Sequence, residues 1–408
     1  MMHKKNKNVK LLLAGRMVSQ FGFVLYLTAL PLHMLKISGS LATVGLLLSV
    51  SSVPAIVITP FLGVWIEHVN RKCFMIACDV ISGLLYALMF FCYQAKVLTP
   101  IVLTIAVTVI NLIYSVFDIA STMMFSELAE ADLLEKYNSV KSIIENGIAI
   151  IGPALATVLY GRFGFYIIVL IASISYSASA IQECFIIYQK RDQQGINKRN
   201  YWKELRDGVS YVINKKTILT ICVLSMSLNF FLGNIEEVIN PGILIQKHQI
   251  SEELFGFTSS AWILGALIGS TFVLRNKRFH LKENMHRFLF IYSIIMIVVG
   301  LLSTLMLNQT YGYFVVFLVC QLLCSVLITC VNVPLWSYLQ TNVELDYQGR
   351  FFSIQSFLTN ILTPLGILYT GYLADWFGAD WAYVINGLCI IMVVLICKPR
   401  LSFLIQQG

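Results

Sequence analysis

Ionisable side chains occur inside several long apolar runs of this sequence, where they would be held out of contact with bulk water. Those within the runs or near their ends are Arg16, Asp79, Asp118, Glu127, Glu145, Glu183, Glu236 and Glu237. An ionised group in an apolar environment is costly, so each of these residues is a candidate for a functional role. A carboxyl group taken out of water can bind and release a proton near neutral pH. Reversible protonation is the chemistry that these acids predict.

The apolar runs must position these groups, and they determine the class of protein. Hydrophobic residues make up 58% of the 408-residue chain and charged residues only 12%, about half the charged fraction of an ordinary soluble domain. An apolar run of about 20 residues can cross a bilayer as a helix. The runs cover about residues 11–35, 41–65, 73–93, 99–121, 139–160, 165–188, 217–238, 254–274, 286–307, 311–335, 351–373 and 381–397. The sequence predicts an all-α membrane protein with twelve transmembrane helices.

Lysine and arginine predict the orientation of these helices. If the N-terminus is cytoplasmic, the loops and tails on that side hold 24 of the 29 basic residues, and the opposite loops hold only Lys36, Lys96, Arg162 and Lys247. Basic residues concentrate on the cytoplasmic side of membrane proteins. We therefore expect both termini in the cytoplasm and a multi-pass protein of a bacterial plasma membrane. The net charge of +8 reflects this bias and predicts no nucleic-acid partner.

One long polar segment divides the chain into two bundles of six helices, residues 1–189 and 217–408. Residues 190–216 are expected to form a cytoplasmic linker. Apolar residues at helical spacing, Tyr201, Leu205, Val209 and Val212, predict an amphipathic helix there; a solvated linker is the alternative.

The two halves also resemble one another when the sequence is shifted by 214 residues. Eight of 33 aligned positions are then identical, including Gly152 with Gly366, Asn146 with Asn360, and Asp132 with Asp346. The fifth and eleventh spans are therefore expected to be equivalent.

Motifs for an enzyme or a metal site are absent from the sequence. The ten cysteines are scattered in or beside apolar runs, with no CxxC pair and no cysteine–histidine spacing for a metal. No phosphate-binding loop, HExxH motif or nucleophile motif occurs. We expect neither catalysis nor a cofactor.

The stretch GVWIEHVNRK, between the second and third spans, resembles the loop signature of the Major Facilitator Superfamily. The resemblance places Gly63, Glu67, Arg71 and Lys72 on the signature positions. Glutamate replaces the usual aspartate, histidine replaces the next basic residue, and asparagine replaces the second glycine. The resemblance implies two bundles that open a central cavity alternately to each side.

In that architecture the loop is expected to act as a gate. Glu67 and Arg71 are one helical turn apart and are expected to pair with each other or with Glu344, Asp346 or Arg350 near the eleventh span. Such a pair biases the inward and outward states if it forms in only one of them. A simple cytoplasmic anchor is the alternative. Asp79 is expected to brace this loop, and Glu183 to reach the membrane surface.

A second stretch, GIAIIGPALATVLYG, resembles the antiporter signature of the fifth span, with Gly147, Gly152 and Pro153 in it. The Gly–Pro pair is expected to interrupt and kink the helix. Two later stretches, NVPLWSYLQTNVELDYQGRFFS and TPLGILYTGYLADWFG, resemble the macrolide-efflux and siderophore-exporter branch of drug and proton antiporters.

The resemblance places Asp118 and Glu145 on helices that line the cavity. Arg16, at similar depth on the first span, is expected to pair alternately with either acid. These three residues are the predicted proton-coupling group. A static buried ion pair is the alternative.

The seventh span carries the predicted substrate group. Asn229, Phe230, Asn234, Glu236 and Glu237 combine aromatic rings with amide and acidic groups, which suits an amphipathic cation. Pro241 and Gly242 are expected to break the helix there, so that a helix cap at its outer end is the alternative role for the glutamates. Further polar residues expected to line the cavity are Asn111, Tyr114, Asn332, Trp336 and Gln355.

These features together predict a secondary transporter that exports lipophilic or amphipathic molecules by proton antiport. Its partners would be a small-molecule substrate, protons and membrane lipid, and we expect a monomer driven by the proton gradient. Export of an endogenous product such as a siderophore is the nearest alternative. An uptake symporter and a membrane receptor are more distant ones.

The predicted topology can be tested by cysteine labelling. In a variant without reactive native cysteines, Lys198→Cys is expected to resist a membrane-impermeant maleimide in intact cells, because the linker is cytoplasmic. Asn308→Cys, in an outer loop, is the matched control and is expected to react. Efficient labelling at position 198 would reverse the orientation.

Overall fold

The computed structural model describes residues 2–128, 131–188, 210, 212–233, 235–275, 281–343, 351, 354–355 and 357–402. This part of the chain contains twelve helices long and apolar enough to cross a membrane, which confirms the predicted helical membrane protein. The helical elements are α1 (Met2–Ser38), α2 (Leu41–His68), α3 (Arg71–Gln94), α4 (Pro100–Leu128), α5 (Ala131–Phe163), α6 (Phe165–Cys184), α8 (Lys216–Leu232), η1 (Ile235–Ile239), η2 (Gly242–Lys247), α9 (Glu252–Arg275), α10 (Leu281–Leu305), α11 (Thr310–Asn342), α13 (Thr363–Phe377) and α14 (Ala379–Ser402).

The chain forms two compact units. The first contains Met1–Gly39, Leu47–Gln193 and Ser251–Gly256, and the second contains Ser40–Leu46, Gln194–Ile250 and Phe257–Gly408. A short segment at the start of α2 thus packs in the second unit, and a short segment at the start of α9 packs in the first. The predicted linker helix lies mostly outside the described residues.

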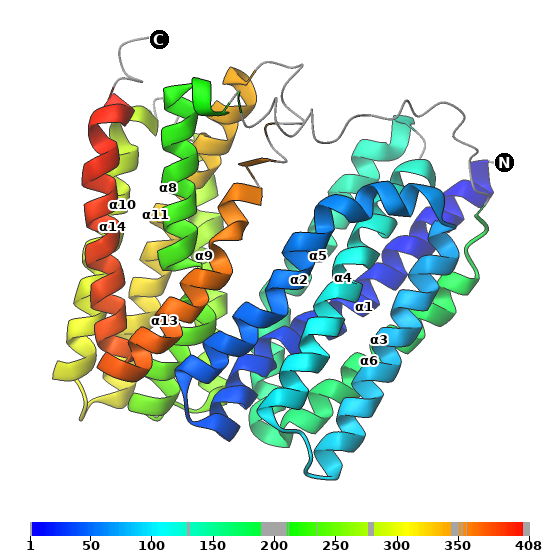
Figure 1. Cartoon of the computed structure of the whole chain (residues 1–408), viewed down its shortest axis with the longest axis horizontal. Helices are drawn as coiled ribbons and strands as arrows, with labels where there is room; N and C mark the ends of the chain where they lie inside the picture. Colours follow the sequence, from blue (N-terminus) through cyan, green and yellow to red (C-terminus); the bar gives the residue numbers. More distant parts are fainter. Residues whose placement is uncertain are drawn as a thin grey trace. The chain divides into compact units, whose positions relative to one another are not determined.

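In the first unit, α6 packs along both α1 and α3 (Figure 1). Large side chains such as Tyr26, Tyr86 and Phe165 are completely buried among these helices. A separate apolar cluster, with Leu12, Ile66 and Phe125 among its members, joins α1, α2 and α4. Burial of these side chains gives the unit a close-packed core between its helices.

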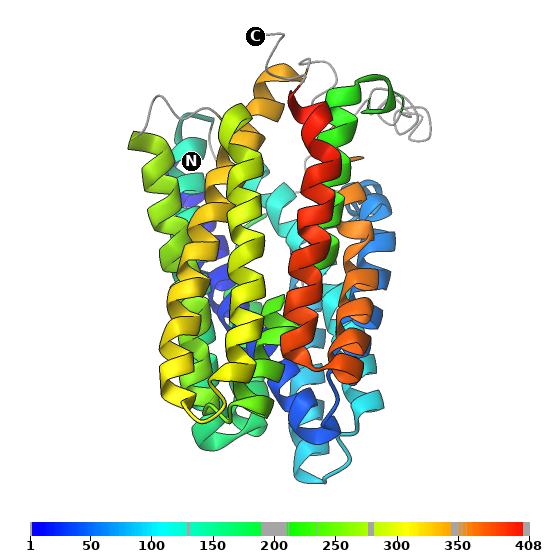
Figure 2. The same ribbon diagram turned by 90° about the vertical axis from the view of Figure 1, so that its left-hand side faces the viewer.

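In the second unit, α14 (red) lies beside α10 (yellow-green), as Figure 2 shows. Close packing is possible where glycine removes side-chain bulk. A Cβ atom at Gly300 of α10 would lie 2.6 Å from the Asp380 carbonyl oxygen at the start of α14. Gly378, with φ of 92°, forms the turn that leads from α13 into α14, a conformation that glycine adopts without strain.

The structure describes both proline-containing spans that the sequence singled out. α5 runs continuously from Ala131 to Phe163 with Pro153 inside it, and the kink expected at Gly152 and Pro153 stays a prediction. The seventh span does not break at Pro241 and Gly242. It continues as the π-helical segments η1 and η2 to Lys247, because the wider π turns accommodate residues that the regular i to i−4 pattern cannot.

The repeat-related glycines Gly152 and Gly366 have the same packing role. A Cβ atom at Gly152 would lie 2.6 Å from Cγ1 of Val24 in α1, the first helix of its half. A Cβ atom at Gly366 of α13 would lie 2.2 Å from the carbonyl oxygen of Phe230 in α8, the first long helix of the other half. The contact between α5 and α1 in the first half therefore corresponds to the contact between α13 and α8 in the second half.

The two exchanged segments are held by polar contacts within their units. In the second unit, Asp375 accepts hydrogen bonds from the Leu41 amide at 2.8 Å and from the Ser40 hydroxyl at 2.6 Å. In the first unit, Glu252 lies 3.4 Å from Lys36, and Glu253 lies 3.4 Å from Arg162. The starts of α2 and α9 are thus fixed by groups remote in sequence.

The contact at Gly366 generates a stability prediction. Gly366→Ala is expected to lower the free energy of unfolding by about 1–3 kcal/mol, because the added methyl group forces α13 away from the α8 backbone. The matched control is Gly147→Ala, since a Cβ atom there would have no neighbour within 4 Å. Thermal unfolding of the purified protein measures both. Equal melting temperatures for the two variants would contradict the proposed contact.

Candidate functional site

Arg16 of α1 is the centre of an ion network in the first unit. Its Nη2 atom lies 2.5 Å from Oδ1 of Asp118 in α4, and its Nε atom lies 3.2 Å from Oε1 of Glu145 in α5. Its Nη1 atom donates a hydrogen bond to the hydroxyl of Ser121. The structure therefore brings the three predicted proton-coupling residues together. It shows both acids bound at once, whereas the sequence predicted alternate pairing, because the guanidinium group has donors on several edges.

The two acids of this network are not fully covered by protein. The exposed fraction of the side chain is 13% for Arg16, 44% for Asp118 and 30% for Glu145. Lys141 adds a second cation, 3.8 Å from Glu145. The carboxylates are therefore only partly enclosed by the protein, in contrast to a fully buried ion pair.

Aromatic side chains border the same network. Tyr114 stacks on Phe23 with ring centroids 3.9 Å apart, and it lies close enough to Asp118 to interact with its charge. Asn111, three residues earlier on α4, instead donates a weak hydrogen bond of 3.4 Å to the Ser51 carbonyl. Of these two predicted polar residues, Tyr114 belongs to the network and Asn111 packs against α2.

Ser121 and Lys141 were missed from the sequence. Their spacing from the predicted acids could have identified both. Ser121 is three residues from Asp118, and Lys141 is four residues before Glu145. Residues at these spacings share one face of a helix.

Glu236 forms the corresponding polar centre of the second unit. Its Oε1 atom accepts hydrogen bonds from Ser259 at 2.9 Å and Thr258 at 3.2 Å, both on α9. Its Oε2 atom accepts from Gln321 of α11 at 2.7 Å and from Asn240 at 3.1 Å. All four donors are neutral. Glu236 thus carries a carboxyl group that neutral dipoles orient.

The position of Glu236 argues against a helix cap. The span continues beyond it to Lys247. Three of its four partners are side chains of other helices, the fourth is the Asn240 side chain of its own span, and none is a backbone amide. π-Helical turns such as η1 often occur at functional sites. Glu237 follows on the same segment and is exposed. The neutral donors Gln321, Thr258 and Ser259 were not predicted; Gln321 stands out as a polar residue inside an apolar run.

The remaining predicted substrate residues do not form one cluster. Asn229 donates to the Ser225 carbonyl of its own helix at 3.0 Å, whereas Phe230 packs on Tyr369 with centroids 5.3 Å apart. Asn332 and Trp336 are exposed on α11, and Gln355 is buried. Asn234 lies outside the described residues.

The predicted gate is only partly described. Gly63 and Glu67 belong to α2, but their side chains lie outside the described residues, as do those of Glu127, Glu344, Asp346 and Arg350. Arg71 is 4% exposed at the start of α3. Lys72 donates to the Cys184 carbonyl at 2.8 Å, which joins the start of α3 to the end of α6. The gating role of this stretch stays a prediction.

Asp79 and Glu183 are both enclosed by the protein, and the bracing role expected of Asp79 stays a prediction. Asp79 is completely buried on the side of α3 that faces α6. Glu183 is only 1% exposed, so the expectation that it reaches the membrane surface is wrong. The tight packing of α6 against α1 and α3 encloses it before its short side chain can leave the protein.

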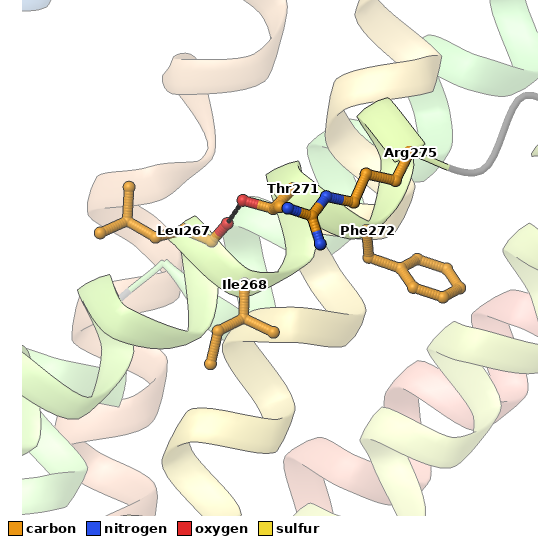
Figure 3. Close-up of a pocket in the computed structure, with 5 residues that line it drawn as sticks. All are labelled: Leu267, Ile268, Thr271, Phe272 and Arg275. Carbon is orange, nitrogen blue, oxygen red and sulfur yellow. Dashed lines mark hydrogen bonds between the residues drawn. The ribbon is translucent and has the colours of Figure 1, made fainter.

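An open recess of about 580 Å³ lies along α9, lined by Leu267, Ile268, Thr271, Phe272 and Arg275. Figure 3 shows the Arg275 side chain extending back along the helix toward Thr271. None of the predicted substrate residues lines it. The recess combines an apolar wall with one cation, Arg275. No role for this residue was predicted from the sequence.

Comparison with known proteins identifies relatives over almost the whole chain. The Uncharacterized MFS-type transporter YfiS of Bacillus subtilis is 23% identical over 96% of this chain and 93% of its own length. Macrolide efflux protein A of Streptococcus pyogenes is 22% identical over 94% of this chain and 93% of its own.

Solved structures share the fold at low identity. The nucleoside transporter NupG superposes with a TM-score of 0.74 at 14% identity, over 97% of this chain and 98% of that one. A bacterial homologue of the iron transporter ferroportin, in an inward-facing state, superposes with a TM-score of 0.73 at 18% identity, over 97% and 99% of the two chains.

The family model of the Major Facilitator Superfamily matches residues 12–367. This match includes the stretches GVWIEHVNRK and GIAIIGPALATVLYG, which carried the resemblance to the superfamily in the sequence. The family consists of transporters rather than enzymes. The chain is therefore a multi-pass membrane transporter that belongs to the Major Facilitator Superfamily.

Proposed function

We propose that this transporter exports lipophilic or amphipathic small molecules, including macrolide-like compounds, in exchange for protons across a bacterial plasma membrane. Similarity to macrolide efflux protein A over 94% of the chain supports the cargo class. The observation that carries the proposal is the binding of one guanidinium group, Arg16, by two solvent-accessible carboxylates.

Proton exchange follows from the competition for Arg16. Protonation of Asp118, the more exposed acid, removes the charge that holds Nη2, while Glu145 keeps its contact with Nε. The affinity of the site for a cation falls with that charge, so that a bound proton and a cationic substrate exclude one another. Alternating access then couples proton entry to substrate exit. The proton gradient supplies about 2.3 kcal/mol per charge for each 100 mV.

Glu236 supplies a separate contact for substrate in the second unit. Its neutral donors hold the carboxyl group in place without neutralising it. An amphipathic cation would gain from this charge, whereas a neutral analogue would depend on apolar contact alone.

An exporter of an endogenous anionic product, such as a siderophore, is the second candidate. Its support is Arg275, which places a cation at the edge of the apolar recess on α9. Arg16 does not favour this alternative, because two carboxylates already bind it.

Removal of the acids in the Arg16 network tests proton coupling. In inverted vesicles with an imposed pH gradient, Asp118→Asn and Glu145→Gln are each expected to reduce accumulation of a macrolide or a cationic dye about tenfold, the effect of losing one charge-assisted contact of about 1.4 kcal/mol. Downhill exchange is expected to persist. Glu253→Gln, at an exposed ion pair, is the matched control. Undiminished gradient-driven export by the Asp118→Asn/Glu145→Gln double variant would rule out both acids.

Glu236→Gln tests the substrate contact. The substitution is expected to weaken transport of a cationic substrate several-fold more than that of a neutral analogue, because only the cation loses a charge interaction. Uptake of both compounds into the same inverted vesicles gives the ratio directly. Equal losses would mean that Glu236 serves the structure alone, and transport of an anionic chelator but of no cation would favour the siderophore alternative.

A further inference from the structure

A pair of acids lies in the first unit, apart from the Arg16 network. Asp79 of α3 is 0% exposed and Glu183 of α6 is 1% exposed. The two helices lie side by side along their length (Figure 1), and the carboxyl groups are close enough to interact electrostatically. Neither residue has a role in the transport scheme above.

A serine and a glycine complete the surroundings of this pair. Ser179, one turn before Glu183 on α6, is completely buried. A Cβ atom at Gly15 of α1 would lie 3.3 Å from the Ser179 hydroxyl oxygen and 3.9 Å from Oε1 of Glu183. The hydroxyl and the carboxyl group therefore face the same point on α1. The hydroxyl is also near enough to Asp79 to stabilise a charge there.

The polar atoms of this group lack conventional partners. Within the described part of the chain, both carboxyl oxygens of Asp79, both of Glu183 and the hydroxyl oxygen of Ser179 have no hydrogen-bond partner of normal geometry. An unsatisfied buried polar atom typically costs about 1–3 kcal/mol, and a charged one costs more. Five such atoms in one place would be costly unless a shared proton or another ligand lowered their charge or satisfied them.

The neighbouring cations do not supply that ligand. On α3, Arg71 lies about two helical turns away, and neither acid accepts a hydrogen bond from it. Lys72 binds the Cys184 carbonyl, and Arg16 of α1 is bound by Asp118 and Glu145. The other titratable groups near the pair, Cys78 of α3 and Tyr176 of α6, cannot carry a positive charge in either protonation state.

We propose that Asp79 and Glu183 form a second proton-binding site, in which the two carboxyl groups share one proton. Two ionised carboxylates that interact while held away from water are too costly to persist. A single proton on one carboxyl group can be donated to the other, which halves the charge and satisfies two of the unpaired oxygens at once.

A proton suits this site better than a metal ion. A hard cation such as Ca²⁺ takes six to eight oxygen ligands, whereas three side chains supply five oxygens here. In the part of the chain that the structure describes, no group of three or more histidine, cysteine, aspartate or glutamate residues could hold a metal ion.

Infrared difference spectroscopy of the purified full-length protein tests the site, and it needs no transported substrate. At neutral pH the wild type is expected to show a carbonyl band of a protonated carboxyl group that shifts in heavy water. The Asp79→Asn/Glu183→Gln double variant is expected to lose one carboxyl equivalent of that band. Glu253→Gln, which removes an exposed acid, is the matched control and is expected to keep it. An unchanged band in the double variant would overturn the proposal.

The single variants and thermal unfolding complete the test. In Asp79→Asn or Glu183→Gln the new amide can donate to the remaining carboxylate, so each variant is expected to fold and to lose the band; a retained band contradicts the sharing of one proton. The melting temperature of the wild type is expected to fall as the pH rises, because loss of the shared proton leaves two interacting like charges. The double variant is expected to lack this dependence. If Na⁺ or Ca²⁺ alone raises the wild-type melting temperature and the double variant does not respond, a metal ion occupies the site instead.

These experiments measure no transport. A result that contradicts the shared proton therefore leaves proton-coupled export untested, and a result that contradicts proton-coupled export leaves the shared proton untested.

Discussion

The electrostatic neutralisation of Arg16 is the interaction on which the first unit depends. A guanidinium group cannot lose its proton at physiological pH, so its burial on α1 requires anionic partners nearby. Asp118 and Glu145 provide them from α4 and α5, and three helices are thereby linked through one side chain. The same contacts leave the acids partly exposed. The charge that stabilises the helix arrangement is therefore also a charge that a proton can remove.

The second unit solves the related problem of a carboxyl group inside the protein in a different way. Glu236 has four neutral donors in place of an arginine. Hydrogen bonds from neutral groups orient a charge without cancelling it. One half of the chain thus pairs opposite charges, whereas the other surrounds one acid with dipoles. The repeated architecture accommodates both arrangements because its helix contacts are set elsewhere, by glycines such as Gly152 and Gly366.

Much of the fold could be predicted because hydropathy and length alone identify helices that cross a membrane. The Arg16 network was also predictable in outline, since ionisable residues in apolar runs are few. The simultaneous pairing of Arg16 with both acids was not predictable, because a sequence gives no distance between helices.

The donors to Glu236 were missed because serine, threonine and glutamine are common and carry no periodic signal. Glu183 was placed wrongly because the packing of α6 against α1 and α3, rather than distance from the helix end, decides whether its side chain reaches the surface. The continuation of the seventh span depends on π turns, which proline and glycine do not reveal in sequence.

The contact between Leu41 and Asp375 has a consequence for how the protein is made. The two residues are 334 positions apart in the chain. At a synthesis rate of about 5–20 residues per second, the start of α2 emerges roughly 15–70 seconds before the helix that carries Asp375. During that interval the Leu41 amide and the Ser40 hydroxyl have no native acceptor on α13. The ribosome-bound intermediate must therefore hold the start of α2 without these two hydrogen bonds, and native assembly of this segment waits until nearly the whole chain has been translated.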